Sequence, residues 1–214
     1  PPPGIVIVVF VEKIWLPGDD DVLVRRVQIA LEKGASARVF VLNAATEYGR
    51  TELEVSLADG ADFELFGANI GTDVSTNEIV TNIRHVGVGG RSRQVIRSVL
   101  NGKAIGSYLG KVEVERGAQQ TDAEQSVKAV LLDRGATANC KPELEIFADD
   151  VKCAHGATVG ELDAMQLFYA ESRGLDPVSA RALLLEGFVM GLWDTAKEPA
   201  AISEAAREAL RRVV

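Results

Sequence analysis

Two residues with metal-binding side chains stand close together in this 214-residue chain, Cys153 and His155. Residues two apart share one face of a β-strand, so a thiolate and an imidazole could meet one soft metal ion. Cys140 is a possible third ligand but lies a full turn away in sequence. A complete site usually has four ligands, so an intrachain zinc site is not expected, whereas two ligands completed by a partner would be reasonable chemistry. Without a metal, the pair is a buried cysteine and a hydrogen-bonded histidine, the commoner arrangement.

Asp149 and Asp150 form a second candidate, because paired carboxylates can divide the acid and base roles of a carbohydrate-active enzyme. Adjacent side chains on a strand point to opposite faces, however, and aspartate is common in turns. A sugar groove also needs aromatic residues, and these make up only 6% of the chain. The carbohydrate-active enzyme is therefore kept as the alternative function.

The remaining candidates are interpreted as structural. His85 follows Ile83 by two positions on an apolar face, which predicts a satisfied core histidine. Residues 87–90 contain three glycines but match neither phosphate-binding pattern, and we expect a loop between two strands. A local basic group has no interleaved aromatics and is expected to be a solvated face; it comprises Arg84, Arg91, Arg93 and Arg97.

The composition excludes several classes of protein. The chain has 23 basic and 31 acidic residues and a net charge of −8, which argues against nucleic acid or an anionic membrane as the main partner. Two cysteines are too few for a disulfide framework, and the apolar run at residues 4–11 is too short to span a bilayer. A cytoplasmic location fits best. The chain opens on three prolines without an initiator methionine, so we expect a fragment.

Alternating β-branched segments dominate before residue 160 and predict strands with one buried face; examples are residues 37–42, 52–57, 62–66 and 111–115. A Gly-Ala pair recurs among them, at Gly34, Gly60, Gly117, Gly135 and Gly156. Glycine suits a corner, and spacings of about 20–30 residues are typical of stacked solenoid turns. The pattern favours a parallel β-helix over residues 1–160, and a β-sandwich is the alternative.

Leucine, alanine and glutamate replace the β-branched residues after position 160 and predict a helical domain over residues 161–214. Asp163 begins a first helix and Gly174 ends it, whereas Asp176 followed by Pro177 begins a second. A third helix is expected over residues 199–214. The second carries an apolar stripe that includes Leu185, Phe188, Val189 and Leu192. Such helices either cap the solenoid, the default expectation, or present the stripe to a partner.

The segment KPELEIFADDVKCAHGATVG at residues 141–160 resembles the signature of the SufB/SufD family. Asp163, residues 166–169 and residues 172–174 continue the pattern, and residues 110–112 and 117–123 precede it. The match is specific over about residues 100–192, looser over 22–99 and absent from the first 20. The K-C-x-H-G-A-T form resembles the SufD branch of the family.

This resemblance implies a non-catalytic scaffold subunit of the SUF iron–sulfur cluster assembly complex, in the cytoplasm. It implies a right-handed parallel β-helix that pairs with SufB, and C-terminal helices that dock the ATPase SufC, which we assign to the stripe of Leu185, Phe188, Val189 and Leu192. A family histidine implicated in cluster assembly falls on His155, with Cys153 beside it. No cofactor is expected to stay bound to this chain alone, although a transient iron–sulfur cluster in the complex is possible chemistry.

Two further expectations complete the set. The family has an N-terminal helical region that this sequence lacks, which supports the fragment interpretation. An isolated chain could bury its pairing surface in a homodimer, and a plain homodimeric scaffold without metal stays open as a third class of function.

Overall fold

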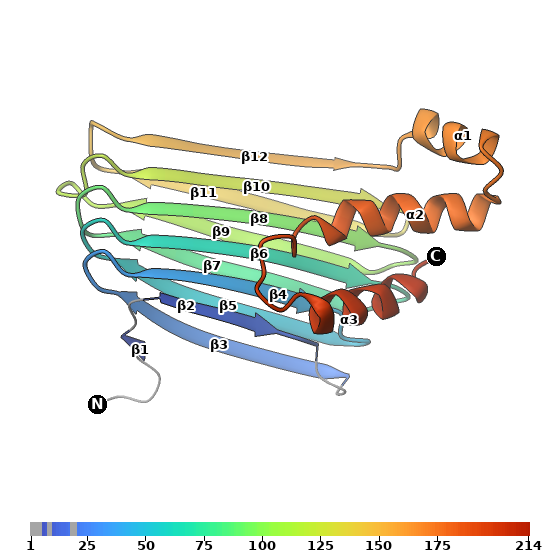
Figure 1. The fold of residues 1–214 in the computed structure, drawn as a ribbon, viewed down its shortest axis with the longest axis horizontal. Helices are drawn as coiled ribbons and strands as arrows, with labels where there is room; N and C mark the ends of the chain where they lie inside the picture. Colours follow the sequence, from blue (N-terminus) through green and yellow to red (C-terminus); the bar gives the residue numbers. More distant parts are fainter. Residues whose placement is uncertain (1–5, 8–9, 18–20) are drawn as a thin grey trace.

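The computed structural model describes residues 6–7, 10–17 and 21–214 and shows a β-solenoid of about five turns followed by three helices (Figure 1). Each turn contributes one strand to each of two parallel sheets. The odd-numbered sheet consists of β1 (Val6–Ile7), β3 (Val22–Leu31), β5 (Tyr48–Leu57), β7 (Thr76–His85), β9 (Ile105–Val114) and β11 (Thr137–Ile146). The even-numbered sheet consists of β2 (Phe10–Trp15), β4 (Ser36–Asn43), β6 (Asp62–Gly71), β8 (Arg91–Leu100), β10 (Asp122–Leu131) and β12 (Lys152–Gly160).

The predicted parallel β-helix is thereby confirmed, and the β-sandwich alternative is wrong. The four predicted segments lie in β4, β5, β6 and β9, although β9 ends at Val114. Residues 87–90 connect β7 to β8, as expected. From β2 to β10, each strand pairs in register with residues 26 to 32 positions further on, as Val22 pairs with Tyr48 and Ile105 with Thr137. The short strand β1 pairs with β3 at an offset of 23 positions, Val6 with Ile29.

One corner of the solenoid is a stack of left-handed residues. Gly34, Gly60 and Gly89 have φ values of 70°, 63° and 69°. The N–H of each donates to a carbonyl of the next turn, at 2.8 Å in all three cases. Gly117 lies in the same corner of a later turn, whereas Gly135 lies in the opposite corner, between β10 and β11. The short spacing between Gly117 and Gly135 therefore corresponds to half a turn of the solenoid and not to a whole turn. The corner predicted at Gly156 is wrong, because this residue lies inside β12.

The interior of the solenoid is apolar over most of its height. Side chains of both sheets alternate inward and meet in a cluster that includes Leu53, Phe63, Leu65, Ile79 and Ile96, all fully buried. The outer face of the odd-numbered sheet is instead polar and carries ion pairs between neighbouring strands, such as Arg50–Glu78 at 3.0 Å. Alternation of this kind explains why the strands could be predicted from period-two patterns.

Three helices follow β12: α1 (Ala164–Ser172), α2 (Pro177–Met190) and α3 (Ala200–Arg211). Asp163 and Asp176 cap α1 and α2 as predicted, each accepting two backbone N–H groups. Gly174 has a φ of 97° just beyond α1. The strand β12 ends at Gly160, and the helices follow it. No helix in the described part of the chain is long and apolar enough to cross a membrane.

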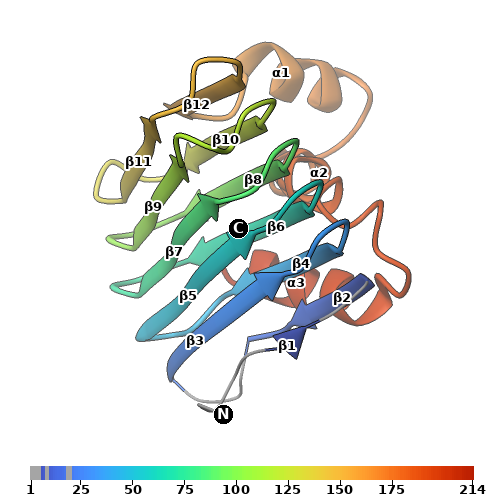
Figure 2. The ribbon, with the colours of Figure 1, turned by 90° about the vertical axis from the view of Figure 1, so that its left-hand side faces the viewer.

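Helices α2 and α3 lie against the outer face of the even-numbered sheet (Figures 1 and 2). Phe40 of β4 stacks on Phe66 of β6 with ring centroids 5.4 Å apart, and Trp193 meets Phe40 edge-on at 6.2 Å. The second halves of β4, β6 and β8 are thus mostly buried on both faces. This explains the uninterrupted apolar run at residues 39–42, which a strand with one exposed face would not carry.

Candidate functional site

Cys153 and His155 both occupy inward-facing positions of β12, the last strand of the even-numbered sheet. In the register with β10, Cys153 pairs with Ala123 and His155 with Gln125. Cys153 is half-buried and His155 is exposed. Burial raises the pKa of the Cys153 thiol, so this group is a protonated thiol at neutral pH and must lose its proton to bind a metal.

Cys140 lies in the same final turn, on the opposite wall of the solenoid. It pairs with Tyr108 of β9, and the Tyr108 hydroxyl reaches across the interior to Gln125, 2.9 Å away. Cys140 therefore stands one rung above Tyr108, as His155 stands one rung above Gln125. Among the described residues, however, no three His, Cys, Asp or Glu side chains are close enough together to hold a metal ion. A complete metal site would need ligands from a partner.

The last turn, made of β11 and β12, leaves the solenoid uncapped at the top of Figures 1 and 2. We call it the open end. No other described strand pairs with the outer edges of β11 and β12. Inward positions that are buried one rung below are only partly buried in β11 and mostly exposed in β12, where Val159 has 46% of its surface accessible. Ile146 and Phe147 add exposed apolar surface at the end of β11.

Asp149 and Asp150 lie in the corner between β11 and β12 and act there as turn residues. The Asp150 carbonyl accepts the N–H of Gln120, and the Asp150 N–H donates to the side chain of Gln119 at 2.9 Å. The adjacent surface hollow is lined by polar, charged and small residues without an aromatic side chain. The backbone of Asp150 thus has a structural role in this corner, and the hollow beside it lacks the aromatic side chains of a sugar groove.

His85 is fully buried between the two sheets. Its Nε2 lies 2.9 Å from the Ser92 hydroxyl, whereas its Nδ1 has no hydrogen-bond partner among the described residues. Burial lowers the pKa of His85 to about 4, so the ring is neutral at physiological pH. The predicted core location is therefore observed, with only one of the two ring nitrogens satisfied.

The four arginines of the predicted basic group do not form a common surface. Arg84 pairs with Glu113 and Glu115 on the odd-numbered sheet. The other three lie on β8, where Arg91 pairs with Asp122, Arg93 with Glu124, and Arg97 lies over the Phe188 ring. Neighbouring acids neutralise most of this charge, in line with the expected solvated face.

The apolar stripe of α2 holds the helix to the solenoid. Leu185, Val189 and Leu192 have 0%, 0% and 4% of their surface accessible, and Phe188 is partly buried in the same cluster. These side chains therefore pack against other parts of the same chain. The exposed apolar side chains of the helices are different ones, and Met165, Phe168 and Tyr169 lie on one face of α1. We call these three residues the α1 face.

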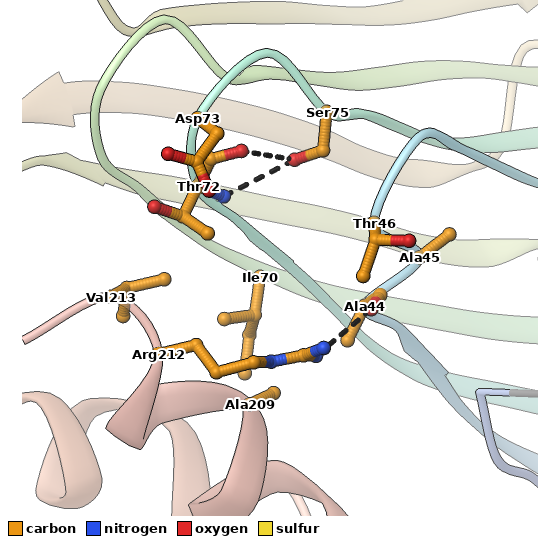
Figure 3. A pocket seen from close by; sticks show the side chains of 10 residues that line it. All are labelled: Ala44, Ala45, Thr46, Ile70, Thr72, Asp73, Ser75, Ala209, Arg212 and Val213. Atoms are coloured by element: carbon orange, nitrogen blue, oxygen red, sulfur yellow. Dashed lines mark hydrogen bonds between the residues drawn. The ribbon is translucent and has the colours of Figure 1, made fainter. Parts of the chain in front are cut away.

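A pocket between the corner turns and the end of α3 is shown in Figure 3. Two of its polar side chains are bonded to the backbone of the fold. Arg212 donates to the Ala44 carbonyl at 3.0 Å, and the Ser75 hydroxyl donates to the Thr72 carbonyl at 2.8 Å. The Arg212 hydrogen bond links the end of α3 to the corner that follows β4. Neither Cys153 nor His155 lines this pocket.

The fold and the open end together define the class of protein: a parallel β-solenoid with helices on one sheet and with thiol and imidazole side chains at its uncapped end. The family model for the SufBD core domain of SUF-system FeS cluster assembly matches residues 10–188. The chain belongs to this SufBD family, and its similarity is to SufD.

Relatives from bacteria agree with this family. The chain is 33% identical over 169 residues to an iron–sulfur cluster assembly SufBD family protein of Synechocystis, which covers 78% of this chain and 37% of that protein. It is 36% identical to the cluster assembly protein SufD of Escherichia coli over 107 residues, 50% of this chain and 25% of that protein. For SufD of Bacillus subtilis the identity is 32% over 120 residues, 56% and 28% of the two chains. The aligned region thus spans well under half of each relative.

Proposed function

We propose that this chain acts as a SufD-like, non-catalytic scaffold in a SUF iron–sulfur cluster assembly complex. The observation that carries the proposal is the open end. A strand edge presents unpaired N–H and C=O groups, and natural proteins normally cover or blunt such edges. Here β11 and β12 are each nine or ten residues long and apolar residues flank them. A SufB-type paralogue is the partner proposed to continue the two sheets.

Pairing at the open end can be tested with one substitution and a matched control. Val159→Asp places a carboxylate at an exposed inward position of β12, and we expect it to abolish co-purification of the SufB-type paralogue. Val24→Asp is the control, because Val24 of β3 is 63% exposed near the other end of the solenoid. Equal recovery of the paralogue with both variants would contradict pairing at the open end. A homodimer of the isolated chain that Val159→Asp also dissolves would show that a second copy covers the same surface.

The cluster under assembly is cargo of the complex, and His155 with Cys153 is proposed to contact it at the pairing surface. Thiolates are the usual ligands of iron–sulfur clusters and imidazole can replace them. Both side chains lie where a partner at the open end would supply the missing ligands. In the assembled complex, His155→Ala should lower iron and sulfide content under anaerobic conditions. Unchanged iron and sulfide would overturn the role of His155.

A SufC-type ATPase is proposed to dock on the C-terminal helices. Because Leu185, Val189 and Leu192 are buried against the solenoid, we propose the α1 face, which groups three exposed apolar side chains on one side of a helix, as the docking surface. Phe168→Asp should abolish retention of the ATPase in a pull-down without lowering thermal stability. Val74→Asp is the matched control, since Val74 is equally exposed in a corner turn of the solenoid. Retention by Phe168→Asp would remove the α1 face from the docking surface.

The two free cysteines suit a reducing compartment such as the cytoplasm. The carbohydrate-active enzyme finds no support in the surface hollow next to Asp150, because no aromatic side chain lines it.

A further inference from the structure

One inward-facing column of side chains changes from apolar to polar between the middle of the solenoid and the open end. It belongs to the even-numbered sheet and runs, in register, through Val39, Leu65, Gln94, Gln125 and His155. The two lower positions are apolar, as expected for a packed interior. Buried amides are costly there unless they are fully hydrogen-bonded, and apolar side chains would fill the same space. The glutamines therefore call for an explanation beyond packing.

Hydrogen bonds fix the orientation of the Gln125 amide. Its Nε2 donates to the Gly110 carbonyl at 3.0 Å and to the Tyr108 hydroxyl at 2.9 Å. A backbone carbonyl can only accept, so the nitrogen of the amide must face Gly110. Both N–H groups of Gln125 are then used.

The rest of the network lies deeper in the solenoid. Tyr108 gives its own proton to Gln94 Oε1 at 2.9 Å, and Thr81 donates to the same oxygen at 2.7 Å. The Tyr108 and Thr81 donors thus both point to Gln94, and neither points to Gln125.

The Oε1 atom of Gln125 is left as a buried acceptor. Gln125 has 1% of its surface accessible, and this oxygen has no partner in the described structure. Gln94 Nε2, one rung deeper, is also unpartnered, but no hydrogen bond joins it to Gln125. One rung higher in the same column stands His155, an exposed side chain with an N–H to give. Rotation of His155 about its side-chain bonds is the simplest way to satisfy the buried oxygen.

We propose that Gln125 is the positioning residue of His155. Its Oε1 accepts the N–H of one ring nitrogen of His155, which holds the imidazole in a single tautomer and leaves the lone pair of the other nitrogen directed to the open end. Histidines that bind metals are commonly oriented in this way, by a hydrogen bond from the nitrogen that does not bind. That this lone pair contacts a cluster rests on the proposed function. The hydrogen bond between His155 and Gln125 needs only this chain.

The test is the tautomer ratio of His155, measured by ¹⁵N NMR of the ring nitrogens at about pH 8.5, well above the ordinary histidine pKa. The same chain unfolded in urea supplies the reference ratio, and a His155→Gln spectrum assigns the signals, because His85 is the only other histidine. We expect the folded chain to differ from the reference by roughly three- to tenfold, the effect of one hydrogen bond of ordinary net strength.

Two variants separate Gln125 from its surroundings. Gln125→Met keeps the length of the side chain but removes the acceptor, and should return the ratio to the reference value. Thr81→Val is the matched control, because it removes a hydrogen bond from the same network without touching Gln125. If Gln125→Met does not fold, Tyr108→Phe takes its place, since it removes one of the two groups that hold the amide and should shift the ratio part of the way.

A folded native chain with the reference ratio, or a Gln125→Met chain with the native ratio, would overturn the inference. Neither measurement needs a partner or a cluster. Failure here is therefore distinguishable from failure of the proposed function, which the iron and sulfide content of the His155→Ala complex decides.

Discussion

A buried neutral histidine makes the stability of this chain depend on pH. The pKa of His85 is lowered by burial to about 4, whereas an unfolded chain gives a histidine its ordinary value near 6.5. As the pH falls between these two values, the unfolded state takes up the proton first. The stabilisation is therefore present above about pH 6.5 and is lost progressively toward pH 4.

We expect His85 to account for a fall of about 3 kcal/mol in the free energy of unfolding over that range. His85→Leu, which places an apolar side chain beside Leu57 in the same column, should remove this part of the pH dependence. Urea unfolding of both chains at pH 7, 5 and 4 checks the prediction. Parallel pH profiles would contradict it.

For single residues, the sequence predicted which side chains share a strand face better than it predicted which side chains of other strands lie next to them. Cys153 and His155 were expected on one face of a strand, and β12 places them so. That Gln125 lies directly beneath His155 could not be predicted, because this depends on a 30-residue offset between β10 and β12 that the uneven glycine spacings do not reveal. A register follows from the whole stack of turns, and a short motif carries no information about it.

Among the elements, the corner stack offers a prediction at a single position. Gln120 has a φ of 61° and donates its N–H to the next turn, as Gly34, Gly60 and Gly89 do in theirs. A side chain in the left-handed region costs roughly 1–2 kcal/mol. Gln120→Gly should thus stabilise the chain by about 1 kcal/mol, and Gly60→Ala should destabilise it by a similar amount.

Thermal unfolding of the two variants, measured in parallel, tests both the expected stabilisation by Gln120→Gly and the expected destabilisation by Gly60→Ala. Space is not the issue at Gly60, because an added Cβ would meet no atom within 4 Å. Any loss in Gly60→Ala can therefore be assigned to backbone conformation. A destabilised Gln120→Gly chain would show that the side chain of Gln120 contributes more than its backbone costs.

Local rules predicted the helix starts at Asp163 and at Asp176 with Pro177, since capping depends on a few adjacent residues. The same rules could not say what the α2 stripe packs against. The missing signal was in the strands, where apolar residues at consecutive positions 39–42 require a second covering layer. Long-range packing of this kind decides which helix face remains for a partner.

For the molecule as a whole, Trp193 is the largest buried side chain between the helices and the solenoid. It is fully buried and packs against Phe40. Trp193→Ala should cost about 3–5 kcal/mol in the free energy of unfolding, and limited proteolysis should then cut first within α2 and α3. Met165→Ala, at an exposed position of α1, is expected to change neither. A loss below about 1 kcal/mol for Trp193→Ala would show that the helices are held elsewhere.

The uncapped last turn also has a kinetic consequence. Each turn of a solenoid is supported only by its neighbours, so β11 and β12 have support from one side, while β4, β6 and β8 lie beneath α2 and α3. Backbone amides should therefore exchange with deuterium in a gradient, fastest in the last turn and slowest in the covered strands. A partner that seats on the open end would slow exchange there first, and would stiffen the part of the chain that carries His155 only once the complex has formed.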